Sequence, residues 1–264
     1  MMELIQENRI DAAFKKGGKV LNIYFTAGFP SFEDTTRIIK ALENAGADMV
    51  EIGMPYSDPV ADGPTIQESN QKALDGGMTI AHLFEQLEDI RMEVNIPIIL
   101  MGYLNPVMQY GVEKFLEKCA EIGIDGTILP DMPLPEYVKD YQKLYKHYGI
   151  HNIFLITPQT SEERIKQIDE MSGGFIYMVA ANSITGAKAK VENTQLAYFQ
   201  RIEKMELQNP KLIGFGISDN KTFEQACSHA DGAIIGSAFI NLLKNSDDLE
   251  EDITAFVKKV KGLS

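Results

Sequence analysis

The sequence predicts an α/β fold, a (β/α)8 TIM barrel that forms a single domain over residues 1–264 with a short N-terminal helix. Eight short β-branched runs alternate with segments that have the periodicity of a helix. Eight such pairs over about 250 residues are what a barrel of this kind requires. No linker, low-complexity tract or charge block divides the 264 residues, which favours one large domain.

The expected strands are short and mostly apolar, as strands buried on both faces of a parallel sheet should be. In chain order they are 20–25, 49–53, 96–101, 126–129, 152–156, 174–179, 212–216 and 232–235. The expected helices have apolar residues three or four apart, and several follow a capping residue such as Ser31, Asp34 or Ser161. They are 32–45, 80–94, 112–122, 135–148, 161–171, 194–205, 222–229 and 249–260.

A doubly wound open sheet is the competing architecture, because periodicity alone does not prove that a sheet closes. That fold predicts a glycine-rich fingerprint after the first strand. The chain has only Thr26-Ala27-Gly28-Phe29-Pro30 there, which favours the barrel.

Composition limits the partners and the compartment. The formal net charge is −13, which argues against nucleic acid or an anionic membrane as the main partner. The start of the chain has no secretory signal, and no uncharged run approaches the length of a membrane span. Cys119 and Cys227 lack CxxC spacing, so we expect buried thiols in a reducing, cytoplasmic compartment.

Two acids in contrasting settings are the strongest chemical signal. Glu51 is the only ionisable residue of an apolar strand, whereas Asp62 lies in the proline- and glycine-containing loop that follows. A carboxylate inside a buried strand costs several kcal/mol unless it is compensated or used, while a loop carboxylate costs little. The two acids are therefore candidates for different protonation roles.

Other candidates lie where later strands end, the edge at which barrel enzymes place their active sites. Tyr177 belongs to the sixth strand, and the segments Gly214–Ser218 and Gly236-Ser237 follow the last two. Small residues there let backbone N–H groups approach an anion, and a helix beginning at Ser237 would add its dipole. We expect a phosphate site without lysine. The four histidines share no ligand spacing, so we expect no metal site.

Structural explanations remain open for each candidate. Glu51 could pair with a basic residue of the barrel, and Asp62 before Gly63 could simply form a turn. Tyr177 could be a core residue, and Asn105 and Asp131, each near a proline, could be loop caps.

The run Glu51–Gln67, with sequence EIGMPYSDPVADGPTIQ, resembles the signature of the tryptophan synthase α subunit family. Shorter matching segments extend along nearly the whole chain: 26–30, 101–106, 131–133, 185–187, 214–218 and 235–238. The resemblance implies a carbon–carbon lyase that cleaves indole-3-glycerol phosphate to indole and glyceraldehyde 3-phosphate. It also implies an α2β2 complex in which indole passes to a β subunit that carries pyridoxal phosphate, while this chain needs no cofactor.

The resemblance also assigns roles to residues. Glu51 carries the proton, Asp62 holds the indole nitrogen, and Tyr177 lies beside the reacting atoms. The phosphate contacts fall on Gly186, Phe215, Gly216, Gly236 and Ser237. The indole wall consists of Tyr24, Ile66, Met101, Leu129 and Leu155, and the β subunit contacts Pro55, Asp58, Asn105 and Pro133.

The sixth loop departs from the family pattern. Many relatives have an Arg and a Gly before the Thr-Gly pair, whereas this chain has Ala180-Ala181-Asn182-Ser183-Ile184 before Thr185 and Gly186. Thr185 is retained, and the resemblance implies that it closes a lid near Asp62. Two alternatives stay open: a stand-alone lyase or other phosphate-binding barrel enzyme, and an activator of a β partner with weak catalysis of its own.

Overall fold

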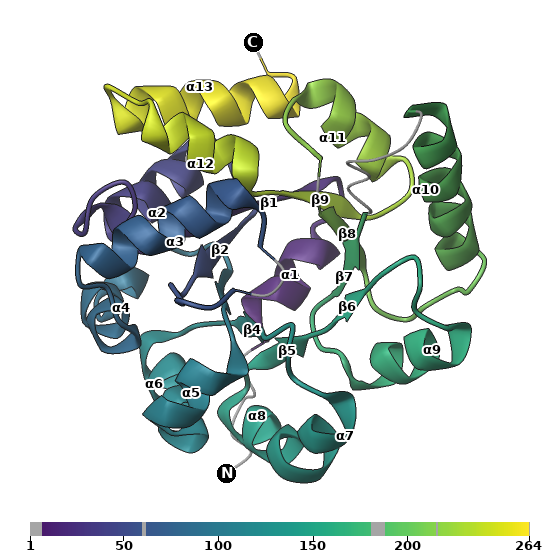
Figure 1. Cartoon of the computed structure of the whole chain (residues 1–264), viewed down its shortest axis with the longest axis horizontal. Coiled ribbons are helices and arrows are strands. Elements are labelled where there is room, and N and C mark those ends of the chain that lie inside the picture. The colour runs from purple at the N-terminus through teal and green to yellow at the C-terminus, as the bar shows by residue number, and fades with distance from the viewer. Residues whose placement is uncertain (1–6, 60–61, 181–187, 215, 264) are drawn as a thin grey trace.

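Parallel strands form a barrel surrounded by helices in the computed structural model, which describes residues 7–59, 62–180, 188–214 and 216–263 (Figure 1). The strands of the one sheet are β1 (Val20–Thr26), β2 (Met49–Gly53), β3 (Ile98–Met101), β4 (Gly126–Ile128), β5 (His151–Ile153), β6 (Leu155–Ile156), β7 (Ile176–Val179), β8 (Lys211–Gly214) and β9 (Gly232–Ile235). Their spatial order is β5-β4-β3-β2-β1-β9-β8-β7-β6.

The barrel closes through one stretch of chain. β5 pairs with β4 and β6 pairs with β7, and only Phe154 separates β5 from β6. The Phe154 carbonyl accepts a hydrogen bond from the Tyr177 amide at 3.0 Å, so this residue also contributes to the sheet. The expected strand 152–156 is therefore one barrel strand that changes partner at its middle. The predicted barrel is confirmed.

Helices surround the ring of strands (Figure 1). The longer ones that follow the strands are α2 (Asp34–Ala45), α4 (Ile80–Leu87), α6 (Val112–Ile122), α8 (Gln142–Tyr148), α9 (Glu162–Met171), α10 (Lys188–Glu203), α11 (Asn220–Cys227) and α13 (Leu249–Lys261). Shorter or inserted ones are α3 (Pro64–Asp75), α5 (Leu104–Tyr110), α7 (Leu134–Glu136), a π-helical segment (Tyr137–Tyr141), a 3-10 turn (Ile90–Met92) and α12 (Ser237–Lys244).

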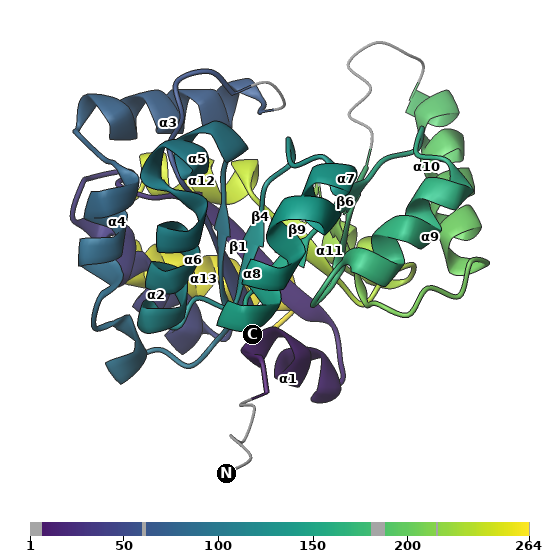
Figure 2. The same cartoon turned by 90° about the horizontal axis from the view of Figure 1, so that it is seen from below.

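The N-terminal helix α1 (Arg9–Lys15) closes one end of the barrel (Figure 2). Its Ile10 is fully buried and approaches two glycines of the barrel, Gly126 and Gly174. A Cβ at these positions would lie 3.0 Å and 2.9 Å from Ile10 side-chain atoms, so a side chain at either site would crowd Ile10. The opposite end of the barrel, which we call the open end, is where α3 and α5 lie (Figure 2).

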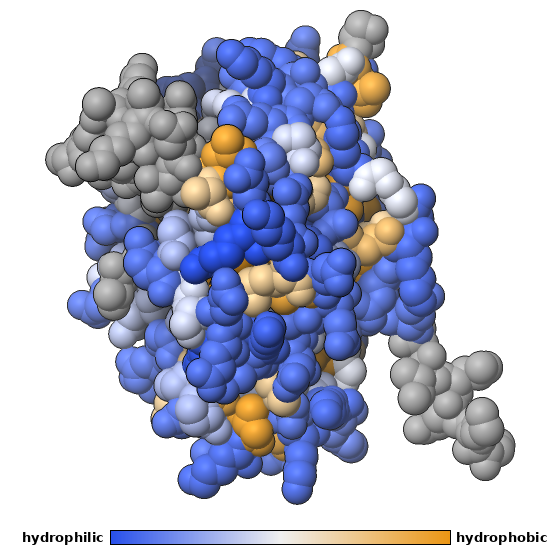
Figure 3. Space-filling model, turned by 90° about the vertical axis from the view of Figure 1, so that its right-hand side faces the viewer, coloured by the Kyte–Doolittle hydropathy of each residue, from blue (hydrophilic) through white to orange (hydrophobic). Residues whose placement is uncertain are grey.

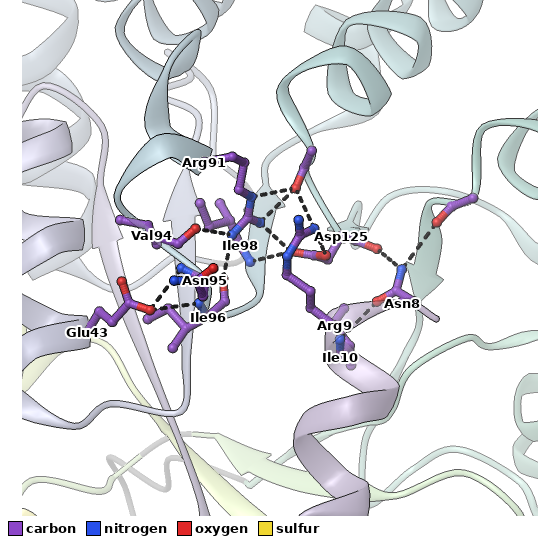
Figure 4. A network of polar contacts seen from close by, with 12 residues as sticks. Asn8, Arg9, Ile10, Glu43, Arg91, Val94, Asn95, Ile96, Ile98 and Asp125 are labelled. Carbon is purple, nitrogen blue, oxygen red and sulfur yellow. Dashed lines mark hydrogen bonds and ion pairs between the residues drawn. The ribbon is translucent and has the colours of Figure 1, made fainter. Parts of the chain in front are cut away.

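A buried carboxylate ties α1 to the barrel (Figure 4). Asp125 accepts from Arg91 Nη2 at 2.5 Å and from Arg9 Nη1 at 3.0 Å, and the Ile98 amide adds a bond of 2.8 Å. Asn8 donates to the Asp125 carbonyl at 2.8 Å. Asp125 directly precedes β4, and its partners come from the N-terminal segment, from the chain before β3 and from the start of β3. These contacts therefore fix the closed end of the barrel.

The face formed by α9 and α10 is mainly hydrophilic, with hydrophobic residues that are separated from one another (Figure 3). Leu196 on α10 is one of the exposed large apolar residues. Nowhere in the described part of the chain is there a helix long and apolar enough to span a membrane.

Candidate active site

The two acids lie at the open end of the barrel in different degrees of burial. Glu51 on β2 is 1% exposed, and Asn22 Nδ2 on β1 donates to its Oε2 at 3.0 Å. The other carboxyl oxygen, Oε1, is buried and has no hydrogen-bond partner. No basic residue pairs with Glu51 among the described residues, which removes the structural ion pair that the sequence left open.

Burial raises the pKa of Glu51 to about 8. The hydrogen bond from Asn22 acts in the opposite direction, and the nearby charge of Asp62 adds to the increase. A desolvated carboxyl group favours its neutral form, because the charged form loses its hydration. Glu51 is therefore a carboxylic acid at neutral pH that can give up a proton.

Asp62 lies in the loop between β2 and α3 and is only partly buried. Tyr103 Oη donates to its Oδ2 at 3.4 Å, and its backbone carbonyl accepts from Gln67 Nε2 at 2.8 Å. Burial raises the pKa of Asp62 too, while the Tyr103 hydroxyl lowers it. Burial therefore raises the pKa of both acids, but Glu51 is the more deeply buried. The surroundings of Asp62 are less polar than its position in a loop suggested.

Two tyrosines flank Glu51. Tyr24 is the register partner of Glu51 on β1, and its hydroxyl occupies the space where Gly53 has no Cβ. The Tyr177 hydroxyl lies in the same way against Gly214 of β8. Burial raises the pKa of both tyrosines, and the charges of Glu51 and Asp62 raise it further. Both hydroxyls therefore stay protonated and can donate hydrogen bonds.

A cavity beside Asp62 brings together part of the predicted indole wall. Its lining includes Tyr24 and Met101, as predicted, and also residues that sequence reasoning missed. The missed residues are Met54, Asn70, Gly102 and Tyr103. Gly102 and Tyr103 belong to a motif that resembles the family, so a signal for them existed. Asn70 had none, because a polar residue in a helix is usually exposed.

The other predicted wall residues, Ile66, Leu129 and Leu155, do not line this cavity. Leu129 is buried directly after β4, and Leu155 on β6 is the register partner of Tyr177. Ile66 on α3 lies near Gly236, since a Cβ on that glycine would be 3.8 Å from Ile66 Cδ1 and 3.4 Å from Tyr24 Cδ1.

The predicted phosphate residues fall at the ends of β8 and β9. Gly216 has φ +77° with open space around its missing Cβ, a backbone conformation that favours glycine. Gly236 is the N-cap of α12 and Ser237 is its first residue; the Phe239 and Ile240 amides donate to the Gly236 carbonyl, which leaves the amides of Ser237 and Ala238 without a partner in the helix. Gly186, Phe215 and the lid residue Thr185 lie outside the described residues.

The predicted partner residues lie on the rim of the same end. Asp58, Asn105 and Pro133 are exposed, and Pro55 is half-buried. Asn105 Nδ2 donates to Tyr56 Oη at 3.4 Å, and the ring of Tyr56 packs on Tyr103 with centroids 5.1 Å apart. Contacts therefore run from the exposed rim to Tyr103, the residue that donates to Asp62.

The sequence left loop-cap roles open for Asn105 and Asp131. Asp131 does act in this way, because its carboxylate accepts from the Leu104 amide at 2.9 Å, at the first residue of α5.

Among the residues that the structure describes, no group of three His, Cys, Asp or Glu side chains is arranged to hold a metal ion.

Comparison with known proteins agrees with this geometry. The family model described as tryptophan synthase alpha chain matches residues 10–263. The tryptophan synthase alpha chain of Christiangramia forsetii is 55% identical over 257 residues, which cover 97% of this chain and 100% of that protein.

Solved structures give the same result. Tryptophan synthase subunit alpha from Legionella pneumophila superposes with a TM-score of 0.87 at 32% identity, over 97% of this chain and 98% of the other. A chain of the tryptophan synthase complex from Pyrococcus furiosus gives 0.82 at 31% identity, over 92% and 98%. The chain belongs to the tryptophan synthase alpha chain family.

Proposed function

We propose that this chain cleaves indole-3-glycerol phosphate to indole and glyceraldehyde 3-phosphate by a retro-aldol reaction in which Glu51 is the proton carrier. The observation that carries the proposal is a fully buried carboxyl group at the open end of the barrel, with a pKa of about 8 and one oxygen unpartnered. Such a group is protonated at neutral pH and has an oxygen available to a substrate.

The reaction needs one proton delivered and one removed. Glu51 gives its proton to indole C3, and positive charge develops on the ring nitrogen. The bond from C3 to the hydroxyl-bearing side-chain carbon then breaks, and its electron pair returns to the ring. The hydroxyl becomes the aldehyde of the product and loses its proton to Glu51, which restores the acid.

Asp62 stabilises the charge at the ring nitrogen, and Tyr177 orients the glycerol chain. Support for Asp62 comes from its place in the cavity with Tyr24 and Met101, apolar surfaces of the kind that a flat heteroaromatic ring needs. The phosphate binds the backbone of Gly186, Phe215, Gly216, Gly236 and Ser237, and Thr185 closes the lid. The cleavage requires no metal and no organic cofactor from this chain.

The proposed partner is a tryptophan synthase β subunit in an α2β2 complex, which carries the pyridoxal phosphate and consumes the indole. Its contact residues are Pro55, Asp58, Asn105 and Pro133. The contacts from Asn105 through Tyr56 and Tyr103 to Asp62 support this choice, because a partner on the rim would touch a chain of side chains that ends at the acid.

Indole release from indole-3-glycerol phosphate tests the proposal. The wild-type chain should release indole, and Glu51→Gln should lose roughly 10²–10⁴-fold in kcat, the contribution of a positioned general acid. Asp169→Asn is the matched control, since Asp169 is a buried carboxylate that accepts from the amides of Gln208 and Asn209. The control should lose stability and keep kcat. Wild-type kcat in Glu51→Gln would exclude Glu51 as the acid.

A further inference from the structure

The amide of Asn22 is the one polar neighbour of Glu51 within hydrogen-bond distance among the described residues. Asn22 is 0% exposed and lies on β1 two residues before Tyr24, the register partner of Glu51. Its side chain therefore points to the same side of the sheet as those of Tyr24 and Glu51. Buried amides are costly unless they are hydrogen-bonded, so a role for this one is expected.

The direction of the hydrogen bond decides where the proton of Glu51 can be. Asn22 Nδ2 donates to Oε2 at 3.0 Å, and in a neutral carboxyl group the carbonyl oxygen accepts better than the hydroxyl oxygen, so this contact favours Oε2 as the carbonyl oxygen. The proton then belongs to Oε1, which is buried and has no partner in the described part of the chain.

We propose that Asn22 is a positioning residue that holds the acidic proton of Glu51 on Oε1, the oxygen that is free to face the substrate. The inference rests on the proposed function of Glu51. Once Glu51 has given its proton away, the same N–H group remains bonded to the carboxylate and stabilises its negative charge. Asn22 thus orients the acid before proton transfer and limits the cost of ionisation after it.

Other titratable groups surround Glu51 and Asn22. Tyr24 on β1 and Tyr177 on β7 interact with the charge of Glu51, and Asp62 interacts with it from the loop after β2. Tyr103 donates to Asp62 rather than to Glu51. Asp62 opposes ionisation of Glu51, so the Asn22 amide is the group that favours it.

The pH dependence of kcat in the full-length chain, with indole-3-glycerol phosphate as substrate, tests the inference. Asn22→Leu keeps a similar size and removes the donor. The loss of activity at high pH, where Glu51 ionises, should move upward by about one pH unit, because the carboxylate loses a stabilising bond. At neutral pH kcat should fall roughly tenfold or more with KM little changed, because the acid is no longer oriented.

A second variant guards against a failure of Asn22→Leu to fold. Asn22→Asp keeps the shape of the amide and replaces its donor with an acceptor, so the same upward shift should be at least as large. Thr127→Val is the matched control, because Thr127 makes a buried hydrogen bond of 2.9 Å to Tyr145 on the outer side of β4. It should lower the melting temperature without moving the high-pH limb.

An unchanged limb in folded Asn22 variants would overturn the inference. A shift to lower pH would also overturn it, since it would mean that the amide accepts the proton of Glu51 through its oxygen. Infrared titration of the Glu51 carboxyl group, with Glu51→Gln as the subtraction reference, measures the same shift without substrate. If the wild type releases no indole, the proposed function fails, while the infrared shift still decides whether Asn22 controls the proton of Glu51.

Discussion

At the residue scale, Glu51 combines burial with the absence of a cationic partner in the described part of the chain. A buried carboxylate usually pairs with a base, and the acids at the closed end of the barrel do so, as Asp125 shows. Glu51 has an amide donor instead, which leaves burial as the dominant influence on its pKa. A buried carboxyl group without a cation beside it lowers the free energy of unfolding when it ionises.

That cost predicts a pH-dependent effect of Glu51→Gln on stability. The pKa of Glu51 is raised from 4.5 to about 8, so the folded protein holds a proton that the unfolded chain releases. The free energy of unfolding of the wild type should therefore fall as pH rises through this window. Glu51→Gln should be more stable by about 2–4 kcal/mol at about pH 8.5, and the difference should shrink towards about pH 5.

Urea denaturation of both proteins at several pH values measures this difference. Glu68→Gln is a suitable control, since Glu68 is exposed and forms an ion pair with Lys244 at 2.5 Å. A stability difference between wild type and Glu51→Gln that does not vary with pH would contradict the raised pKa.

Tyr103→Phe tests the environment of Asp62. The Tyr103 hydroxyl lowers the pKa of Asp62, so its removal should raise that pKa. In the proposed function Asp62 holds the indole nitrogen as a carboxylate, so the acidic limb of the pH profile should move to higher pH. The rate of indole release between pH 5 and 8 is the measurement. Tyr110→Phe, which changes a tyrosine packed on Phe84, should leave the profile unchanged.

Sequence reasoning found Glu51 because a charged residue in an apolar strand is conspicuous. The same reasoning could have found Asn22, a lone amide in β1, but an uncharged side chain gives a weaker signal. It could not find Tyr103 as a partner of Asp62, since the two residues are 41 positions apart and meet only through the fold. Asn70 was hidden for a similar reason, because only the packing of α3 buries it.

At the scale of elements, the register of the strands places Glu51 and Tyr177. Tyr24 pairs with Glu51, Glu51 with Ile99, and Leu155 with Tyr177. Register partners point to the same side of a sheet, so these residues share the inside of the barrel. Glycines at the ends of β2 and β8 then make room for the two tyrosine hydroxyls.

Gly214→Ala should therefore disturb Tyr177. A Cβ at this position would overlap the Oη, Cζ and Cε1 atoms of Tyr177, so the ring must move. We expect a loss of about 1–3 kcal/mol in the free energy of unfolding from overpacking and a clear fall in kcat. Gly76→Ala is the control, since its nearest contact would be 3.3 Å and its φ of −75° is ordinary. Equal effects of the two changes on kcat would count against a role for Tyr177.

Periodicity predicted elements with an apolar stripe and missed those without one. Strands 49–53 and 232–235 and helix 112–122 agree with the structure at both ends. α3 was missed because the residues that it buries are Ser69, Asn70 and Ala73, which form no apolar pattern. α5 was missed because it buries only Val107 and contains Pro106. Both missed helices lie at the open end, where function rather than core packing determines the sequence.

At the scale of the whole molecule, the two ends of the barrel have separate tasks. The closed end holds α1 through the ion pairs of Asp125, and the open end holds Glu51, which has a hydrogen bond from Asn22 and no cation beside it among the described residues. Stability and chemistry should therefore respond to different substitutions.

Arg91→Met tests this separation. It leaves the buried carboxylate of Asp125 with Arg9 alone and should cost on the order of 3 kcal/mol in the free energy of unfolding. Arg37→Met, which breaks an exposed ion pair with Glu250, should cost less than about 1 kcal/mol. Both variants should keep wild-type kcat at a temperature where they are folded. A large fall in kcat for Arg91→Met would show that the two ends are coupled.

The dependence of indole release on pH in the wild-type chain tests the central claim most directly. If Glu51 acts as a neutral acid, kcat/KM for cleavage of indole-3-glycerol phosphate should fall as pH rises through about 8, where Glu51 of the ligand-free protein ionises. A kcat/KM that stays constant from about pH 6 to pH 10 would contradict the claim, because an acid with this pKa would have lost its proton within that range.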